Sequence, residues 1–147
     1  GDMADIAETH IMILHVGLSQ NLAPEWNDHR DQISDRLQAM IQSGFDTSDA
    51  DYDAAMARAD DYRARADDLF GDCDIFLTPS APGVAPKGLD ATGDPMFQIP
   101  WTLLRTPCVT IPFATGPNGL PVGVQLVARP GEDDKLLAIA KWFHGRM

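Results

Sequence analysis

Hydrophobic and polar positions alternate most regularly between residues 106 and 129. Two runs rich in β-branched and aromatic residues, 108–113 and 121–128, flank a linker of Gly, Pro and Asn at 116–119. The runs suit pleated strands and the linker is typical of a turn, so the pattern predicts a β-hairpin with a loop longer than two residues. Gln125 is an amide within the apolar second run. Because a buried amide needs a hydrogen-bond partner, we expect Gln125 to anchor a neighbouring segment.

Apolar residues recur at three- and four-residue spacing elsewhere, which predicts amphipathic helices. In the first helix, Ile11, Leu14 and Leu18 form the apolar face. A short apolar run at 74–77 predicts a further strand directly after a long helix, an order typical of α/β proteins. The expected helices cover residues 4–22, 27–43, 48–70, 95–104 and 132–144.

Local signals predict where several helices begin and end. Gly44 is a candidate C-terminal stop for the second helix. Ser48 and Asp51 resemble a capping box in which aspartate replaces glutamate, at the start of the third. Pro100 is expected to limit the fourth helix or to split it.

The composition describes a globular chain of 147 residues, 44% of them hydrophobic, which fits one domain over 1–147. Acidic residues number 22 against 11 basic ones, and the net charge of −11 argues against a nucleic-acid surface or a cationic membrane helix. No apolar run approaches the roughly 20 residues that a bilayer-spanning helix needs. The start, GDMADIAETH, lacks the basic and apolar parts of a secretory signal. These features predict a soluble, cytoplasmic protein with no nucleic-acid or membrane partner.

Side chains that could bind a metal are poorly placed for it. Cys73 and Cys108 lie at apolar positions without metal-ligand spacing, which predicts buried, reduced thiols. His10 and His15 are about 140° apart around a helix and cannot chelate one ion from one face. The acidic run 49–53 resembles the start of a calcium loop, but alanine stands where such a loop requires glycine. We expect no metal and no cofactor.

Catalytic motifs are missing as well. No serine stands in a Gly-x-Ser-x-Gly elbow, and the chain has no HExxH, CxxC, Walker or GxGxxG motif. The loop over 78–93, rich in Pro, Gly and Ala, is long for a compact domain and follows a predicted strand, so it is a candidate pocket wall. Phe97 and Trp101 share a helix face, which suits either core packing or the lining of a pocket.

Several stretches together resemble the C-terminal third of amidase-signature enzymes. They read DIFLTPSAP, GDPMFQIPWTLLRTPCVTIP, GLPVGVQLVA and GEDDKLLAIAKWF. The resemblance implies a mixed sheet flanked by helices and the hydrolysis of carboxylic amides to an acid and ammonia or an amine. It also implies catalysis by a Ser–Ser–Lys arrangement in the N-terminal part of the family's fold. This chain has no adjacent serine pair, so no catalytic residue carries over.

The resemblance therefore implies a C-terminal portion of a bacterial amidase that is inactive alone. Such a portion would supply sheet scaffold and part of the pocket for a small amide, with the missing N-terminal catalytic part as its partner. Open strand edges would favour a homodimer or a swapped oligomer. By resemblance, four residues would line the pocket: Ser80, Phe97, Trp101 and Leu104.

Two alternatives stay open. One is a ligand-binding or interaction module that keeps the fold without the chemistry. The other is part of an amidotransferase A-type subunit, which in this family feeds ammonia to charged tRNA. The stretch IMILHVGLSQNLAPEWNDHR lacks the basic segment expected of such subunits, which favours a stand-alone amidase as the parent protein.

Overall fold

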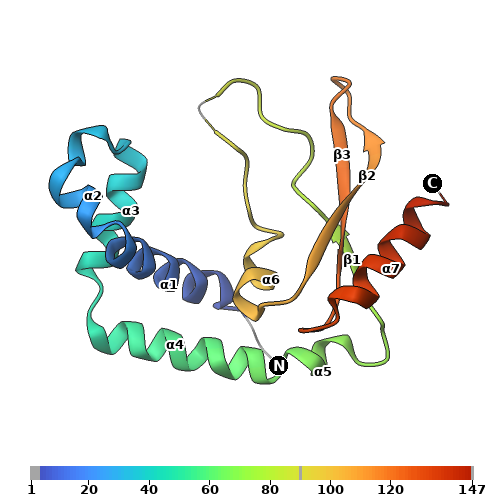
Figure 1. The fold of residues 1–147 in the computed structure, drawn as a ribbon, viewed down its shortest axis with the longest axis horizontal. Coiled ribbons are helices and arrows are strands. Elements are labelled where there is room, and N and C mark those ends of the chain that lie inside the picture. The colour runs from blue at the N-terminus through green and yellow to red at the C-terminus, as the bar shows by residue number, and fades with distance from the viewer. Residues whose placement is uncertain (1–3, 90, 147) are drawn as a thin grey trace. The chain divides into compact units, whose positions relative to one another are not determined.

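The computed structural model describes residues 4–89 and 91–146 and is drawn in Figure 1. The chain divides into two compact units, which meet at the peptide bond between Asp61 and Tyr62. Among the described residues, the first unit contains only helices and the second contains the sheet. The helices of the first unit make most of their contacts with one another.

In the first unit, two long helices are joined by a short helix and a 3₁₀ turn that the sequence pattern did not predict. The prediction of one helix over 27–43 is wrong at its start. Pro24 opens a separate short helix, since proline has no N–H and is tolerated only in a first turn. The next long helix begins after Ser34, whose Oγ accepts a hydrogen bond from the Leu37 N–H at 3.4 Å. The elements are α1 (Ile6–Asn21), α2 (Ala23–Asp28), the 3₁₀ helix η1 (Arg30–Gln32), α3 (Asp35–Asp46) and most of α4 (Asp49–Ala64).

Gly44 does not end α3 but lies inside it, against α1. A Cβ atom at this position would lie 2.1 Å from the carbonyl oxygen of His15 and 2.9 Å from Cβ of Ser19. Only glycine permits so close an approach of the two helix backbones. The predicted stop is therefore a packing residue, and α3 continues for two further residues.

Two of the three residues predicted for the apolar face of α1 are exposed. Ile11 and Leu14 are 42% and 39% exposed, whereas the buried residues of α1 are Thr9, Val16 and Ser19. Small side chains at the helix crossing let α1 and α3 approach closely around Gly44. Tertiary packing has thus overridden the apolar periodicity.

The third predicted helix is divided into α4 and α5 (Ala66–Phe70) at Arg65. The N–H of Arg65 donates to a carbonyl three residues back, at 3.2 Å, which tightens the last turn of α4. The N-cap half of the predicted capping box is present, whereas the Asp51 carboxylate accepts from the Ser48 hydroxyl and not from the Ser48 N–H. Ser48 Oγ accepts from the Asp51 N–H at 3.2 Å and donates to Asp51 Oδ2 at 2.6 Å.

The second unit contains an antiparallel three-stranded sheet with the order β1-β3-β2. Strands β2 and β3 form the predicted hairpin, with a bulge between Pro112 and Ala114. The strand expected at 74–77 instead covers Phe76–Pro79, because its pairing with β3 begins at Phe76 opposite Val127. The α/β class, with a sheet flanked by helices, is confirmed. The elements after α5 are β1 (Phe76–Pro79), α6 (Ile99–Leu104), β2 (Cys108–Thr115), β3 (Pro121–Val127) and α7 (Asp133–His144).

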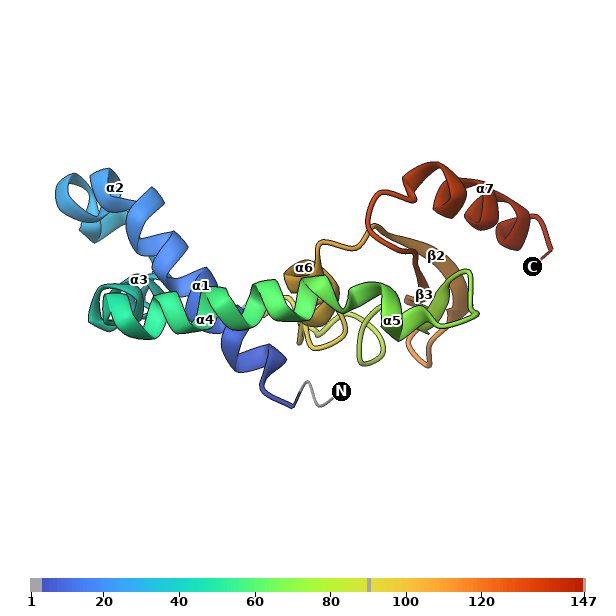
Figure 2. The same cartoon turned by 90° about the horizontal axis from the view of Figure 1, so that it is seen from below.

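The two faces of this sheet are covered by different helices, α7 on one side and α6 on the other (Figures 1 and 2). On the α7 side, Ile111 and Leu126 pack with Leu136 and Ala140. On the other side, the ring of Phe76 lies between two aromatic rings. Its centroid is 4.6 Å from that of Phe70 in α5 and 5.7 Å from that of Trp101 in α6.

Both cysteines are free thiols, but the expectation that they are buried is wrong. Cys73 lies in the exposed connection after α5, and Cys108 lies on β2, an edge strand of the described sheet. Among the residues that the structure describes, no helix is both long and apolar enough to cross a membrane.

Candidate functional site

The long loop between β1 and α6 runs beside the hairpin and returns to the sheet at α6 (Figure 1). The first half of the loop, which contains Val84, packs on the hairpin turn. A Cβ atom on Gly116 would lie only 2.2 Å from Cγ1 of Val84. The hairpin therefore supports the loop directly, and the glycine in the turn is needed for this contact.

Gln125 lies at the centre of the sheet and ties the end of this loop to it. It pairs with Thr78 on β1 and with Thr110 on β2, so the three side chains share the face towards α6. The Gln125 side chain is 2% exposed. Its Nε2 donates to the carbonyl oxygen of Phe97 at 3.0 Å and to Oγ1 of Thr78 at 3.1 Å. The prediction that Gln125 anchors a neighbouring segment is confirmed.

A second amide holds the beginning of the loop. Nε2 of Gln98 donates to the carbonyl oxygen of Ser80, and the Ser80 N–H donates to the carbonyl oxygen of Gly123 at 3.2 Å. Gln98 and Gln125, which we call the amide pair, thus bring Ser80 and Phe97 to the same corner of the sheet. The sequence pattern gave no signal for Gln98, because its importance comes only from the return of the loop.

The side-chain hydroxyl of Ser80, at this corner of the sheet, lacks a hydrogen-bond partner. Its Oγ is buried and has no hydrogen-bond partner among the described residues. A Cβ atom on Gly123 would lie 3.0 Å from this oxygen and 2.7 Å from Cγ2 of Thr110. The absence of a side chain at Gly123 therefore lets the Ser80 hydroxyl and the Thr110 methyl group pack against the β3 backbone. Because a buried hydroxyl without a partner carries a free-energy cost, Ser80 Oγ is suited to bind a polar atom of a ligand or a water.

The helix that carries two of the predicted pocket residues is shorter than expected. α6 begins at Ile99 with Pro100 in its first turn, so the proline limits the helix as predicted. The stretch expected as its first turn is instead a turn closed by the Met96 N–H, which donates to Asp94 Oδ1 at 2.9 Å.

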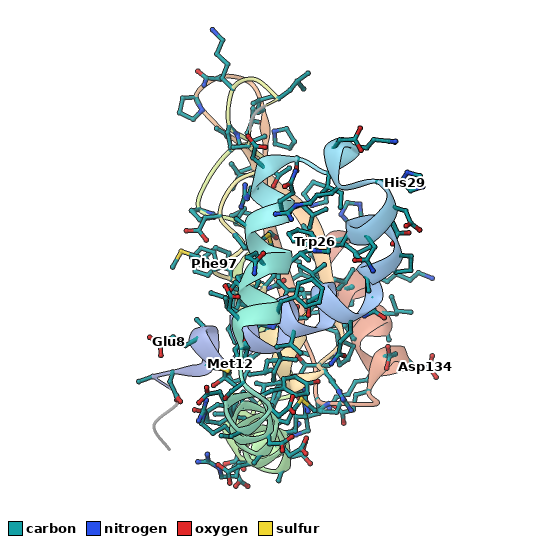
Figure 3. All side chains as sticks on the ribbon, turned by 90° about the vertical axis from the view of Figure 1, so that its left-hand side faces the viewer. Glu8, Met12, Trp26, His29, Phe97 and Asp134 are labelled. Atoms are coloured by element: carbon teal, nitrogen blue, oxygen red, sulfur yellow. The ribbon has the colours of Figure 1, made fainter. Side chains whose placement is uncertain are left out.

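The structure separates the four predicted pocket residues by environment. Ser80, Phe97 and Trp101 are half-buried, and Phe97 is labelled in Figure 3. Leu104 is 1% exposed and lies within the core. The stack of Trp101 on Phe76 shows that this ring takes part in core packing, one of the two roles left open by the sequence.

A pocket of about 200 Å³ lies between the two limbs of the loop. Its walls are mostly apolar, and Asp94 is the one ionisable residue among those that line it. None of the four predicted residues lines it. The lining residues are Ala81, Pro82, Val84, Ala85, Pro86, Thr92, Gly93 and Asp94.

The described residues contain no group of three or more His, Cys, Asp or Glu side chains that could hold a metal ion. Burial lowers the pKa of His10, which disfavours its protonated form. His15 Nδ1 lies 3.0 Å from Ser43 Oγ, so this ring is engaged in a contact between α1 and α3.

Comparison with known proteins identifies the family to which this chain belongs. The family model named Amidase matches residues 7–137. The chain therefore belongs to the amidase family, as its sequence blocks suggested. A solved structure described as an amidase superposes with a TM-score of 0.89 over 98% of this chain, at 24% sequence identity. A 6-aminohexanoate cyclic dimer hydrolase complexed with substrate has a TM-score of 0.78 over 99% of the chain, at 18% identity.

Relatives by sequence include two kinds of protein. The A-type subunit of the glutamyl-tRNA(Gln) amidotransferase of Pseudothermotoga lettingae is 37% identical over 110 residues, which cover 67% of this chain. The putative amidase AmiB2 of Mycobacterium tuberculosis is 30% identical over 139 residues, or 80% of this chain. These matches span 23% and 30% of the two relatives, and the chain covers 36% of the amidase structure.

Proposed function

We propose that this chain is the C-terminal portion of an amidase-signature hydrolase that cleaves carboxylic amides to an acid and ammonia or an amine. The observation that carries the proposal is the family match over residues 7–137. It is supported by the superposition of nearly the whole chain on about one third of an amidase. The parent protein is then an enzyme, whereas this portion supplies sheet scaffold and part of the substrate pocket.

The pocket role rests on the corner held by the amide pair. Ser80 offers a buried hydroxyl without a partner, and Phe97 is fixed beside it through its own carbonyl. A polar substrate atom would gain a hydrogen bond from a hydroxyl that is already desolvated, while the aromatic ring would contact an apolar substituent. Trp101 would flank these two residues, and Leu104 would support the helix from within.

The 147 residues should be inactive by themselves, because they contain no adjacent serine pair of the kind that the family resemblance implies for catalysis. The test compares two proteins: this chain, and the product of the complete reading frame that encodes it, from its own start codon. Ammonia release from a panel of primary and N-substituted amides is measured for both. We expect hydrolysis only by the product of the complete reading frame. Hydrolysis by the chain alone, or by neither protein, would refute the proposal.

The pocket role has its own test in the active protein. Replacing Ser80 by Ala and Phe97 by Ala should raise KM or change the preference among amides. Leu137→Ala on the exposed side of α7 should change neither, since Leu137 lies on the far side of the sheet from the corner. Equal kinetics for all three variants would contradict the assignment of Ser80 and Phe97.

A second candidate, an amidotransferase A-type subunit, is favoured by the 37% identical relative from Pseudothermotoga lettingae. The net charge of −11 counts against direct contact with tRNA by this portion of the protein. The two candidates differ in the acceptor of the released ammonia. Activity on free amides without a partner subunit or charged tRNA supports the stand-alone amidase, and strict dependence on both supports the alternative. The proposal of an amidase portion also includes a cytoplasmic location. It further includes self-association of the isolated chain through its open strand edges.

A further inference from the structure

The backbone of Ser80 is held on both sides of its Cα atom. On one side, its N–H donates to the carbonyl oxygen of Gly123 on β3 at 3.2 Å. On the other side, its carbonyl oxygen accepts from Nε2 of Gln98, which lies 18 positions further along the chain. Only two backbone torsions separate these groups, so the two hydrogen bonds together fix the direction of the Cα–Cβ bond. The position of the Ser80 hydroxyl then depends on the χ1 torsion alone.

A side chain, and not the sheet, supplies the second of these hydrogen bonds. Strand β1 ends at Pro79, just before Ser80. The chain then leaves the strand in a three-residue turn, in which the Gly83 N–H donates to the Ala81 carbonyl oxygen at 2.8 Å. Gln98, directly before α6, therefore does for the end of this strand what a further ladder hydrogen bond would do.

The Ser80 hydroxyl is buried in this arrangement and has no partner among the residues that the structure describes. It lies close to β3, where a Cβ atom on Gly123 would be 3.0 Å from Oγ. A desolvated hydroxyl gains more from a new hydrogen bond than one that must first give up water. That gain depends on accurate placement, because a hydrogen bond weakens steeply when its donor is misaligned.

We propose that Gln98 is a positioning residue for amide binding and acts through Ser80. Its side-chain amide fixes the Ser80 carbonyl group, and this aims the Ser80 hydroxyl at a polar atom of the substrate. Gln98 itself does not contact the substrate. The inference rests on the proposed function, because it deepens the pocket role of Ser80. It gives a role in substrate affinity to a residue outside the four that the sequence predicted for the pocket.

The test measures amide hydrolysis by the product of the complete reading frame and by three variants of it: Gln98→Met, Ser80→Ala and the double variant. Methionine keeps the length of the side chain and removes the donor. Gln98→Met should raise KM about three- to tenfold, the effect of losing one hydrogen bond, and leave kcat nearly unchanged. A purely structural role would instead reduce the amount of folded enzyme, which lowers the apparent kcat and leaves KM unchanged.

The double variant decides whether Gln98 acts through Ser80. In the Ser80→Ala background, Gln98→Met should have almost no further effect on KM, because the hydroxyl that it aims is already missing. Across the panel of amides, the substrates sensitive to Ser80→Ala should be those sensitive to Gln98→Met. Additive effects of the two changes would overturn the proposal, as would an unchanged KM in Gln98→Met.

Thr102→Val is the matched control at the same corner. Thr102 Oγ1 donates to the main-chain carbonyl oxygen of Gln98 at 3.0 Å, so the change weakens the start of α6 and leaves the Gln98 side chain in place. It should not alter KM. A rise equal to that of Gln98→Met would show that loosening α6 is sufficient, and the role of the Gln98 amide would be wrong.

The outcomes separate this inference from the proposed function. If the complete protein hydrolyses no amide, the proposed function fails and the inference fails with it. If the protein is active and Ser80→Ala raises KM but Gln98→Met does not, only the role of Gln98 is wrong. If Ser80→Ala leaves KM unchanged for every amide, the hydroxyl contacts no substrate, and both the pocket role of Ser80 and this inference are wrong.

Discussion

Replacing Gln125 by Leu tests the central claim that a buried amide holds the loop to the sheet. The change removes the donors to the Phe97 carbonyl and to Thr78 Oγ1. Two hydrogen bonds contribute about 1 kcal/mol each, and an unpaired buried carbonyl costs about 1–3 kcal/mol. Burial of the leucine offsets about 1–2 kcal/mol. We expect a net loss of about 2 kcal/mol in the stability of the second unit.

Hydrogen exchange is the appropriate assay, because the two units need not unfold together and a single melting midpoint would mix them. A loss of about 2 kcal/mol corresponds to roughly 30-fold faster exchange. The acceleration should be seen in peptides that cover β1, the loop and α6. Thr78→Val removes only one acceptor and should have a smaller effect in the same peptides.

Gln42→Leu is the matched control, since Gln42 is an exposed amide on α3 that bonds only to Asp46 among the contacts described. It should leave exchange in the second unit unchanged. If Gln125→Leu behaves like Gln42→Leu, the amide does not hold the loop, and the reasoning about the corner fails.

Three further changes test particular features of the fold. Gly44→Ala should destabilise the first unit by about 1–3 kcal/mol, because the added Cβ overpacks the contact with α1. Gly17→Ala is the control on α1, where the added Cβ meets nothing within 4 Å, and it should stabilise the unit by about 0.5–1 kcal/mol. Thermal melts measure both effects. Arg105→Gly should raise stability by about 1 kcal/mol in urea melts, because Arg105 has a φ of +58°. Asp74→Asn should slightly lower the melting temperature at pH 7, and the difference from the wild type should shrink as the pH falls below 3.8. Lys135, 2.9 Å away, holds the pKa of Asp74 below its ordinary value of 3.8.

The sign of the last prediction follows from the direction of the shift. A carboxyl whose pKa is lowered in the folded state contributes stability above its unfolded pKa and loses it as the pH falls through the folded value. A difference between the wild type and Asp74→Asn that does not shrink as the pH falls below 3.8 would contradict the assignment, as would one that is unaffected by high salt. For the other two changes, the contradicting results are a tolerated Gly44→Ala and a destabilising Arg105→Gly.

The sequence was a good guide where the signal is local. The β-favouring runs of the hairpin and the N-cap at Ser48 depend on neighbours in the chain, and both are confirmed. Gln125 was also predictable, because an amide inside an apolar strand needs a partner wherever it lies. Pro100 limited α6 for an equally local reason, its missing N–H.

The errors occur where distant segments meet. The sequence predicted Gly44 to be a helix stop, but in the structure it permits close contact between α3 and α1. A contact with a distant helix cannot be predicted from the residues that neighbour Gly44 in the chain. The apolar face of α1 with Ile11 was a correct periodicity, yet its direction was set by small residues at the helix crossing. Gln98 and the unpartnered hydroxyl of Ser80 acquire their roles only when the loop returns to the sheet. Whether Ser80 contacts a substrate stays a prediction.

The amide pair has a consequence for how this loop can change. Gln98 and Gln125 donate hydrogen bonds to the main-chain carbonyl oxygens of residues 80 and 97. A carbonyl is present whatever side chain those positions carry. The ends of the loop therefore remain fixed while the residues between them are exchanged. A library randomised at positions 81, 82, 85 and 92 would reshape the pocket wall while keeping Val84 and the two glycines with positive φ, Gly83 and Gly93. Substrate preference could thus diverge among descendants of this chain at little risk to folding.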